Sequence, residues 1–100
     1  MLRESTADGA LTLEVGQSFA PEDAVRIHEL IEHAEPGTSV EIDFRRVREC
    51  QDFALALLAK DLVGGRGRVA VRGMSQHQQR MLGYFGVGAD GRGGDGREIV

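Results

Sequence analysis

The sequence predicts a small single-domain α/β fold, in which a mixed and mostly parallel sheet of about four to five strands is covered by about three to four helices. Two observations support this prediction. Segments in which apolar and polar residues alternate, as in strands, follow one another along the chain with segments of helical period between them. The chain also has 100 residues, a length that allows one hydrophobic core.

The N-terminal part of the chain predicts a β-hairpin. Residues 2–5 could form a short first strand, and Asp8-Gly9 is a turn dipeptide whose glycine readily adopts positive φ. In residues 11–15, three apolar side chains alternate with polar ones and therefore point to one face. This hairpin should add an antiparallel edge to a sheet whose other strands are joined by right-handed crossovers.

The first helix is predicted at residues 21–33. Ala24, Ile27 and Ile31 recur there on one face, which should pack on the sheet. Pro21 suits the first turn of a helix, where its missing N–H has no partner to lose.

The remaining elements alternate between strand and helix. Residues 40–44 alternate apolar and polar side chains and predict the clearest strand of the chain. Residues 53–63 are almost continuously apolar and rich in helix formers, which predicts a buried central helix. Residues 68–72 predict a short strand, and a third helix should begin after Ser75, which can form a capping box with Gln78.

The C-terminal residues differ in composition from the rest. Residues 88–100 are rich in glycine and contain too little apolar surface to offset the entropy lost on ordering. We therefore expect residues 1–87 to form the folded domain and residues 88–100 to form a flexible tail.

Composition excludes several classes of function. A formal net charge of -4 gives no concentrated basic face, so we expect no nucleic-acid partner. The single cysteine, Cys50, cannot form an internal disulfide, and no N-terminal apolar stretch resembles a signal peptide or a membrane span, which favours the cytoplasm without direct membrane insertion. His28, His33 and His77 show no spacing for a metal site, and no cofactor is expected.

No group of residues predicts catalysis. Ser18, Ser39 and Ser75 have no histidine and acid partner that the sequence identifies. The Gly-Gly-Arg-Gly run at residues 64–67 is not followed by the Lys-Ser or Lys-Thr of a phosphate-binding loop, and it is explained as a helix stop and a turn. We predict that the chain is not an enzyme.

One stretch of the chain resembles the signature of STAS domains, the fold of anti-sigma-factor antagonists. The family strand V-x-I-D-L is similar to Val-Glu-Ile-Asp-Phe at residues 40–44, and Val47 falls on the valine that follows it. The family sequence Asp-Ser-Ser-Gly-Leu, which opens a helix, aligns without a gap on Gln-Asp-Phe-Ala-Leu at residues 51–55. With the later strand and helix, the resemblance covers residues 11–87 and implies a STAS-like fold.

The resemblance implies where a partner protein binds. In the family, the first serine of Asp-Ser-Ser-Gly is phosphorylated by an anti-sigma-type kinase, and phosphorylation releases that partner. Asp52 stands at this position, Gln51 replaces the preceding aspartate and Phe53 replaces the following serine. No hydroxyl remains, so we expect no phosphorylation there. The predicted partner-binding region consists of Gln51, Asp52 and Phe53 with nearby Arg48.

The sequence leaves open the roles of several residues in and near this region. Asp52 is either only a helix N-cap or a permanent negative charge that imitates a phosphoserine at a helix N-terminus. Phe53 is expected to be a core or rim residue, and becomes a partner anchor if it is exposed. Cys50 is expected to pack as a small apolar residue, with a reactive thiol before the helix as the alternative. Arg45, Arg46 and Arg48 are expected to be solvated loop residues, or the rim of an interaction face.

Three classes of function can be considered for this sequence: a regulatory binding module, an accessory subunit of a transporter, and a small enzyme or nucleotide binder. The resemblance favours a non-catalytic regulatory module of bacterial signal transduction and transcription regulation, bound to an anti-sigma-type kinase or another STAS-containing assembly. The alternative is a STAS-type cytoplasmic accessory subunit that docks on the ATPase of a lipid or anion transporter. A small enzyme or nucleotide binder is disfavoured, because no residues for its chemistry are identified. A homodimer is compatible with each.

Overall fold

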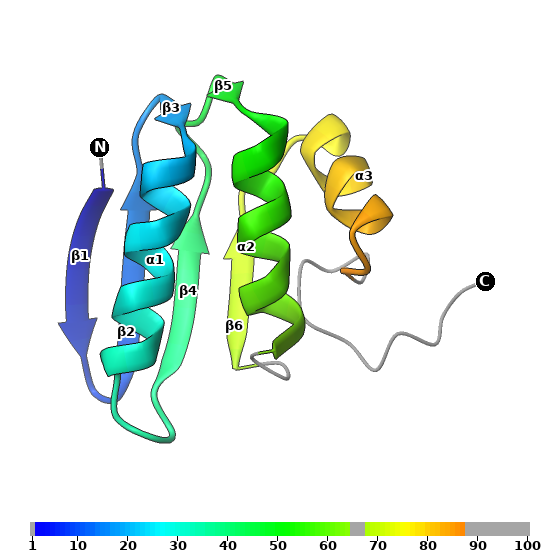
Figure 1. Ribbon diagram of the computed structural model, residues 1–100. Helices are drawn as coiled ribbons and strands as arrows, with labels where there is room; N and C mark the ends of the chain where they lie inside the picture. The colour runs from blue at the N-terminus through cyan, green and yellow to red at the C-terminus, as the bar shows by residue number, and fades with distance from the viewer. Residues whose placement is uncertain (1, 65–67, 88–100) are drawn as a thin grey trace.

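The computed structural model describes residues 2–64 and 68–87 (Figure 1). Strands and helices alternate from the first hairpin to the last helix, as the sequence predicts. In chain order the elements are β1 (Leu2–Ala7), β2 (Ala10–Val15), β3 (Ser18–Phe19), α1 (Pro21–His33), β4 (Ser39–Asp43), β5 (Glu49–Cys50), α2 (Asp52–Gly64), β6 (Val69–Arg72) and α3 (Gln76–Tyr84).

The main sheet has four strands in the order β1-β2-β4-β6. The β1–β2 pair is antiparallel, whereas β2–β4 and β4–β6 are parallel, which confirms the predicted mixed and mostly parallel sheet. The turn between β1 and β2 contains Asp8 and Gly9, both at positive φ (50° and 75°), as a tight two-residue hairpin turn requires. Helices α1 and α2 lie over one face of this sheet (Figure 1).

The hydrophobic core lies between the sheet and these two helices. Buried residues of β2, β4 and β6 point inward, so that Leu13, Ile42 and Val71 stand side by side in neighbouring strands. The predicted stripe of α1, formed by Ala24, Ile27 and Ile31, is buried against them. The apolar α2 contributes a wider buried surface, which confirms the predicted central helix; its buried residues are Ala54, Leu55, Leu58, Ala59 and Leu62.

A second, smaller sheet was not predicted. It consists of β3 and β5, which pair in parallel through Ser18↔Glu49 and Phe19↔Cys50. Phe19 is buried and its ring lies 4.8 Å from that of Phe44, so the small sheet is fixed to the main core. Part of the segment between β4 and α2, which the sequence predicts only as a loop, is therefore held in place by its pairing with β3.

The last helix begins with the predicted capping box. The backbone N–H of Gln78 donates to Ser75 Oγ at 3.1 Å, and the backbone N–H of Ser75 donates to Gln78 Oε1 at 2.9 Å. Leu82 and Val87 are buried and attach this end of the chain to the core. The predicted flexible tail at residues 88–100 lies outside the described residues.

Candidate protein-interaction site

The predicted partner-binding region lies beyond the carboxyl ends of the parallel strands. There β4 is followed by β5, and β5 leads through Gln51 into α2; β3 lies beside β5 at the same end of the molecule (Figure 1). Open α/β sheets present their binding surfaces at this end, because the loops that follow parallel strands gather there.

Backbone hydrogen bonds hold this segment in place. The N–H groups of Arg48 and Glu49 both donate to the carbonyl oxygen of Gln17, at 2.7 and 3.0 Å. The N–H of Gln51 donates to the carbonyl oxygen of Phe19 at 3.1 Å. Because Phe19 belongs to the core, the approach to α2 is fixed in position rather than free to move as an open loop.

Asp52 is the first residue of α2, and the prediction that it is the N-cap was wrong by one position. The N–H of Leu55 donates to the carbonyl oxygen of Gln51 at 3.1 Å, which gives Gln51 the N-cap position. Asp52 is exposed, and its carboxylate accepts no hydrogen bond from any residue that the structure describes. A carboxylate in the first turn is still stabilised by the positive end of the helix dipole.

Phe53 is exposed, which corrects the expectation that it is a core or rim residue. Its relative exposure is 65%, whereas the next two residues, Ala54 and Leu55, are buried. Each helical residue is turned by about 100° from the last, so a helix that buries positions 54, 55 and 58 directs position 53 away from the sheet. The alternative interpretation of Phe53, as an exposed aromatic side chain next to Asp52, fits the structure.

The arginines before α2 have different surroundings. Arg46 and Arg48 are exposed, as expected of loop residues, and Arg48 lies three residues before Gln51. Arg45 is more than a solvated loop residue. Its Nε donates to both carboxylate oxygens of Asp43, at 3.1 and 3.0 Å, and its backbone N–H donates to Oδ1 at 2.9 Å.

The contact with Arg45 keeps the buried Asp43 ionised. Only 6% of Asp43 is exposed. Burial raises its pKa, but the hydrogen bonds and the charge of Arg45, with a smaller effect of Arg72, outweigh burial and lower the pKa below its ordinary value. The Ile-Asp-Phe pattern predicts that Asp43 belongs to a strand. Nothing in the sequence indicates that Arg45, two residues later, forms hydrogen bonds with its carboxylate.

Gly73 completes this corner. Its φ is +78°, a backbone conformation that favours glycine, and a Cβ atom there would lie 2.4 Å from Arg45 Cγ and 2.9 Å from the Arg45 backbone nitrogen. The loop after β6 therefore packs directly on the loop after β4. Only a residue without a side chain fits between them.

Cys50 packs partly against the core, as expected. Burial, together with the negative charge of Asp52, raises the pKa of its thiol to about 11. The thiolate is the reactive form of cysteine, so this environment disfavours the alternative of a reactive thiol.

The exposed side chains of this region are an amide, a carboxylate, an aromatic ring and a guanidinium group. Among residues 2–64 and 68–87, no group of three His, Cys, Asp or Glu side chains could hold a metal ion. In the same residues, no helix is both long enough and apolar enough to cross a membrane. Gln51, Asp52 and Phe53 are all exposed where α2 begins, and Arg48, also exposed, lies in the loop just before β5. Such a surface offers a carboxylate, an amide and an aromatic ring to another molecule.

Comparison with known proteins identifies the family. A family model described as "Mlab, STAS domain" matches residues 2–90. No curated protein and no solved structure matches the chain. The match covers most of the chain, including the whole main sheet and all the residues of the exposed turn, and the observed fold agrees with it. The chain belongs to the STAS domain family.

Proposed function

We propose that this protein is a non-catalytic regulatory module that resembles an anti-sigma-factor antagonist and binds a partner protein through the first turn of α2. One observation carries the proposal. Phe53 is 65% exposed and stands next to Asp52, whose carboxylate accepts no hydrogen bond from the residues that the structure describes. STAS domains are in general non-catalytic, which agrees with such a role.

The side chains of Phe53 and Asp52 can make contacts with a partner that they lack in the isolated domain. A largely exposed phenylalanine contributes little to the core, but it can bury a large apolar area against a partner, as aromatic anchors of interfaces do. Asp52 supplies a charge that selects the partner's surface. Because β3 and β5 hold the approach to α2, little conformational entropy is lost when this turn binds.

The charge of this turn is permanent. The family's phosphoacceptor position holds Asp52, and neither Gln51 nor Phe53 provides a hydroxyl, so phosphorylation at this turn cannot release a partner. A carboxylate carries one charge, where a phosphoserine carries roughly -1.5 to -2. We therefore propose an interaction with an anti-sigma-type kinase, or with another STAS-containing assembly, that is not switched at residue 52.

A second candidate is an accessory subunit of a lipid or anion transporter, docked on its ATPase subunit. The family model that matches is described as a STAS domain and does not specify an anti-sigma-factor antagonist, so it is equally compatible with this candidate. The same exposed turn would serve as the docking surface. The two candidates differ in the partner and not in the residues that bind it.

Affinity capture with matched baits tests the proposal. The intact chain, Phe53→Ala, Asp52→Ser and Tyr84→Ala are immobilised at equal amounts, exposed to lysate of the source cells, and the retained proteins are quantified by mass spectrometry. Tyr84 is 74% exposed and lies in α3, so its replacement is a control for loss of any exposed aromatic ring. Each bait is first checked for native circular dichroism.

The expected result is one partner that the intact chain and Tyr84→Ala retain equally, that Phe53→Ala retains about tenfold less, and whose amount changes with Asp52→Ser. A kinase of the anti-sigma type would identify the first candidate, and a transporter ATPase the second. Equal retention by all four baits would contradict the proposed site.

A further inference from the structure

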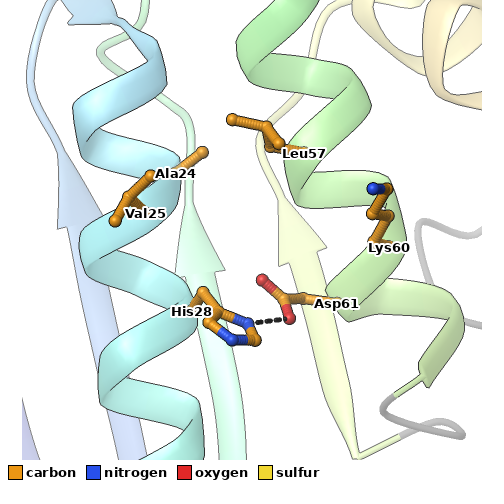
Figure 2. A pocket seen from close by; sticks show the side chains of 6 residues that line it. All are labelled: Ala24, Val25, His28, Leu57, Lys60 and Asp61. Carbon is orange, nitrogen blue, oxygen red and sulfur yellow. Dashed lines mark hydrogen bonds and ion pairs between the residues drawn. The ribbon is translucent and has the colours of Figure 1, made fainter.

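A groove runs between α1 and α2 on the outer side of the helix layer (Figure 2). Its volume is about 250 Å³. Both helices contribute side chains to its walls, and these differ in character along its length. The lining residues are Ala24, Val25, His28, Leu57, Lys60 and Asp61.

The apolar part of the groove continues the surface formed by Phe53. Leu57 follows Phe53 by four residues, and residues four apart lie on the same side of a helix. Leu57 is partly buried and extends from α2 toward α1, where Val25 is 49% exposed (Figure 2). Apolar side chains therefore extend from the first turn of α2 across to α1. Apolar residues that gather on one exposed face in this way are typical of protein interfaces.

The other end of the groove is polar. His28 Nδ1 and Asp61 Oδ1 are 2.7 Å apart, and their hydrogen bond joins α1 to α2. The side chain of Asp61 is only 12% exposed. Its second oxygen, Oδ2, points into the space between the two helices and accepts no hydrogen bond from the residues that the structure describes (Figure 2). The groove thus ends in a carboxylate oxygen that can accept a hydrogen bond from a bound group.

The volume of the groove matches one aromatic side chain. An apolar cavity of about 150 Å³ holds a benzene ring, whereas pockets for whole small-molecule ligands usually have about 300 to 1,000 Å³. The groove, at about 250 Å³, lies between these values. Because the bond between His28 and Asp61 holds its two walls together, the groove is already formed before a ring enters.

The chemistry of the groove selects among aromatic side chains. A ring between Val25 and Leu57 would be surrounded by apolar groups, and a donor at its edge would meet Asp61 Oδ2. Tryptophan has such a donor in its indole N–H and tyrosine in its O–H, whereas phenylalanine has none. Tryptophan and tyrosine are also the aromatic residues most enriched among the energetically important residues of interfaces.

A second copy of the chain is a poor source of this side chain. The sequence contains no tryptophan and one tyrosine, Tyr84. Tyr84 lies in α3, which stands beyond α2 on the side away from α1 (Figure 1). Insertion of Tyr84 into the groove of another copy would join two different surfaces, and such a contact does not close into a symmetric dimer. A different protein is therefore favoured.

We propose that the groove between α1 and α2 receives one tryptophan or tyrosine side chain of the partner protein, whose ring packs between Val25 and Leu57 and whose N–H or O–H donates to Asp61 Oδ2. This assignment rests on the proposed function, because it gives the groove to the same partner that contacts Phe53 and Asp52. It extends the contact surface from the first turn of α2 across to α1.

A small aromatic probe tests the groove without the partner. N-acetyl-tryptophanamide is titrated into the full chain, and the methyl groups of Val25 and Leu57 are followed by NMR. Its 1-methylindole derivative keeps the ring but lacks the N–H donor. The protein variants are Val25→Glu and Val63→Glu, a matched control because Val63 is 41% exposed in α2 but does not line the groove. Native circular dichroism is the check of folding.

We expect saturable shifts of both methyl signals, with a Kd on the order of 1 mM for the intact chain. Binding should be about tenfold weaker for the 1-methyl derivative, because a hydrogen bond to a carboxylate is lost, and about tenfold weaker for Val25→Glu. Val63→Glu should bind like the intact chain. No saturable shift at these methyl groups, equal affinity for the two probes, or equal affinity of the two variants would overturn the proposal.

The same two variants, used as baits beside Phe53→Ala, connect the groove to the partner. We expect Val25→Glu and Phe53→Ala each to retain about tenfold less partner, and Val63→Glu to retain as much as the intact chain. Full retention by Val25→Glu with loss in Phe53→Ala would overturn the groove assignment and leave the proposed function intact. Loss in Val25→Glu with full retention by Phe53→Ala would support the groove and contradict the proposed site at the first turn of α2. Sedimentation of the intact chain as an assembly that Tyr84→Ala dissociates would assign the groove to a second copy and overturn the proposal.

Discussion

Asp43 and Asp52 stand nine residues apart in the stretch that resembles the family signature, yet their surroundings differ. Asp43 is buried at the end of β4, and its carboxylate is occupied by Arg45. Asp52 is exposed at the start of α2, and its carboxylate accepts no hydrogen bond from the described part of the chain. The carboxylate of Asp43 thus stabilises the fold, whereas the carboxylate of Asp52 is exposed to solvent and available to a partner. Burial and hydrogen bonding distinguish them.

The largest expected effect is that of Gly73→Ala, which acts on the corner around Asp43. The new Cβ would have to lie 2.4 Å from Arg45 Cγ, on a backbone with a φ of +78°. Displacement of Arg45 would also disturb its contact with Asp43. We expect the free energy of unfolding to fall by about 3 kcal/mol, measured by urea denaturation. Gly64→Ala, in a helix with open space around its Cβ position, is the control and should not destabilise the protein.

Asp43→Asn and Asp52→Asn give the direct comparison of the two carboxylates. Asn at position 43 keeps the shape of the side chain but loses the charge that faces the Arg45 guanidinium, and we expect a loss of about 2 kcal/mol of unfolding free energy. At position 52 no intramolecular hydrogen bond is lost, and we expect a change within about 0.5 kcal/mol. Equal losses in urea denaturation would show that the two sites do not differ in this way.

Part of the pH dependence of stability on the acidic side should come from Asp43. The pKa of Asp43 is lower in the folded protein than its ordinary value of 3.8, so this carboxylate stabilises the fold above that value. The stabilisation is lost as pH falls through the lower pKa of the folded state. Unfolding free energies measured from about pH 7 to about pH 2 should therefore converge for the intact chain and Asp43→Asn at the acidic end. A difference that stays constant with pH would contradict this assignment.

Much of the fold could be predicted from the sequence because its elements have clear periods. The stripe Ala24, Ile27 and Ile31 placed α1, and the alternation in residues 40–44 placed β4. The pair β3–β5 was missed because two-residue strands are too short to show a period of two. Their order depends on backbone hydrogen bonds between segments distant in the chain, such as the one from Gln51 to Phe19, which no local pattern encodes.

The candidate site was predicted less completely. The resemblance identified residues 51–53, but the burial of Phe53 was predicted wrongly, because α2 is largely apolar. The exposed Lys60, seven residues after Phe53 and so on the same side of the helix, was the one signal in the sequence for its exposure. The Asp43–Arg45 contact lies where the loops after β4 and β6 pack together, and the groove between α1 and α2 depends on how these two helices pack. These features require the three-dimensional arrangement.

The central claim, that the first turn of α2 serves binding and not stability, is tested most directly on Phe53→Ala with two readouts from the same preparation. Unfolding free energy is measured by urea denaturation, and the amount of partner retained from lysate is measured per folded molecule. We expect a stability within about 0.5 kcal/mol of that of the intact chain, because 65% of Phe53 is exposed, together with about a tenfold loss of the retained partner. A stability loss above about 2 kcal/mol, or full retention of the partner, would contradict it.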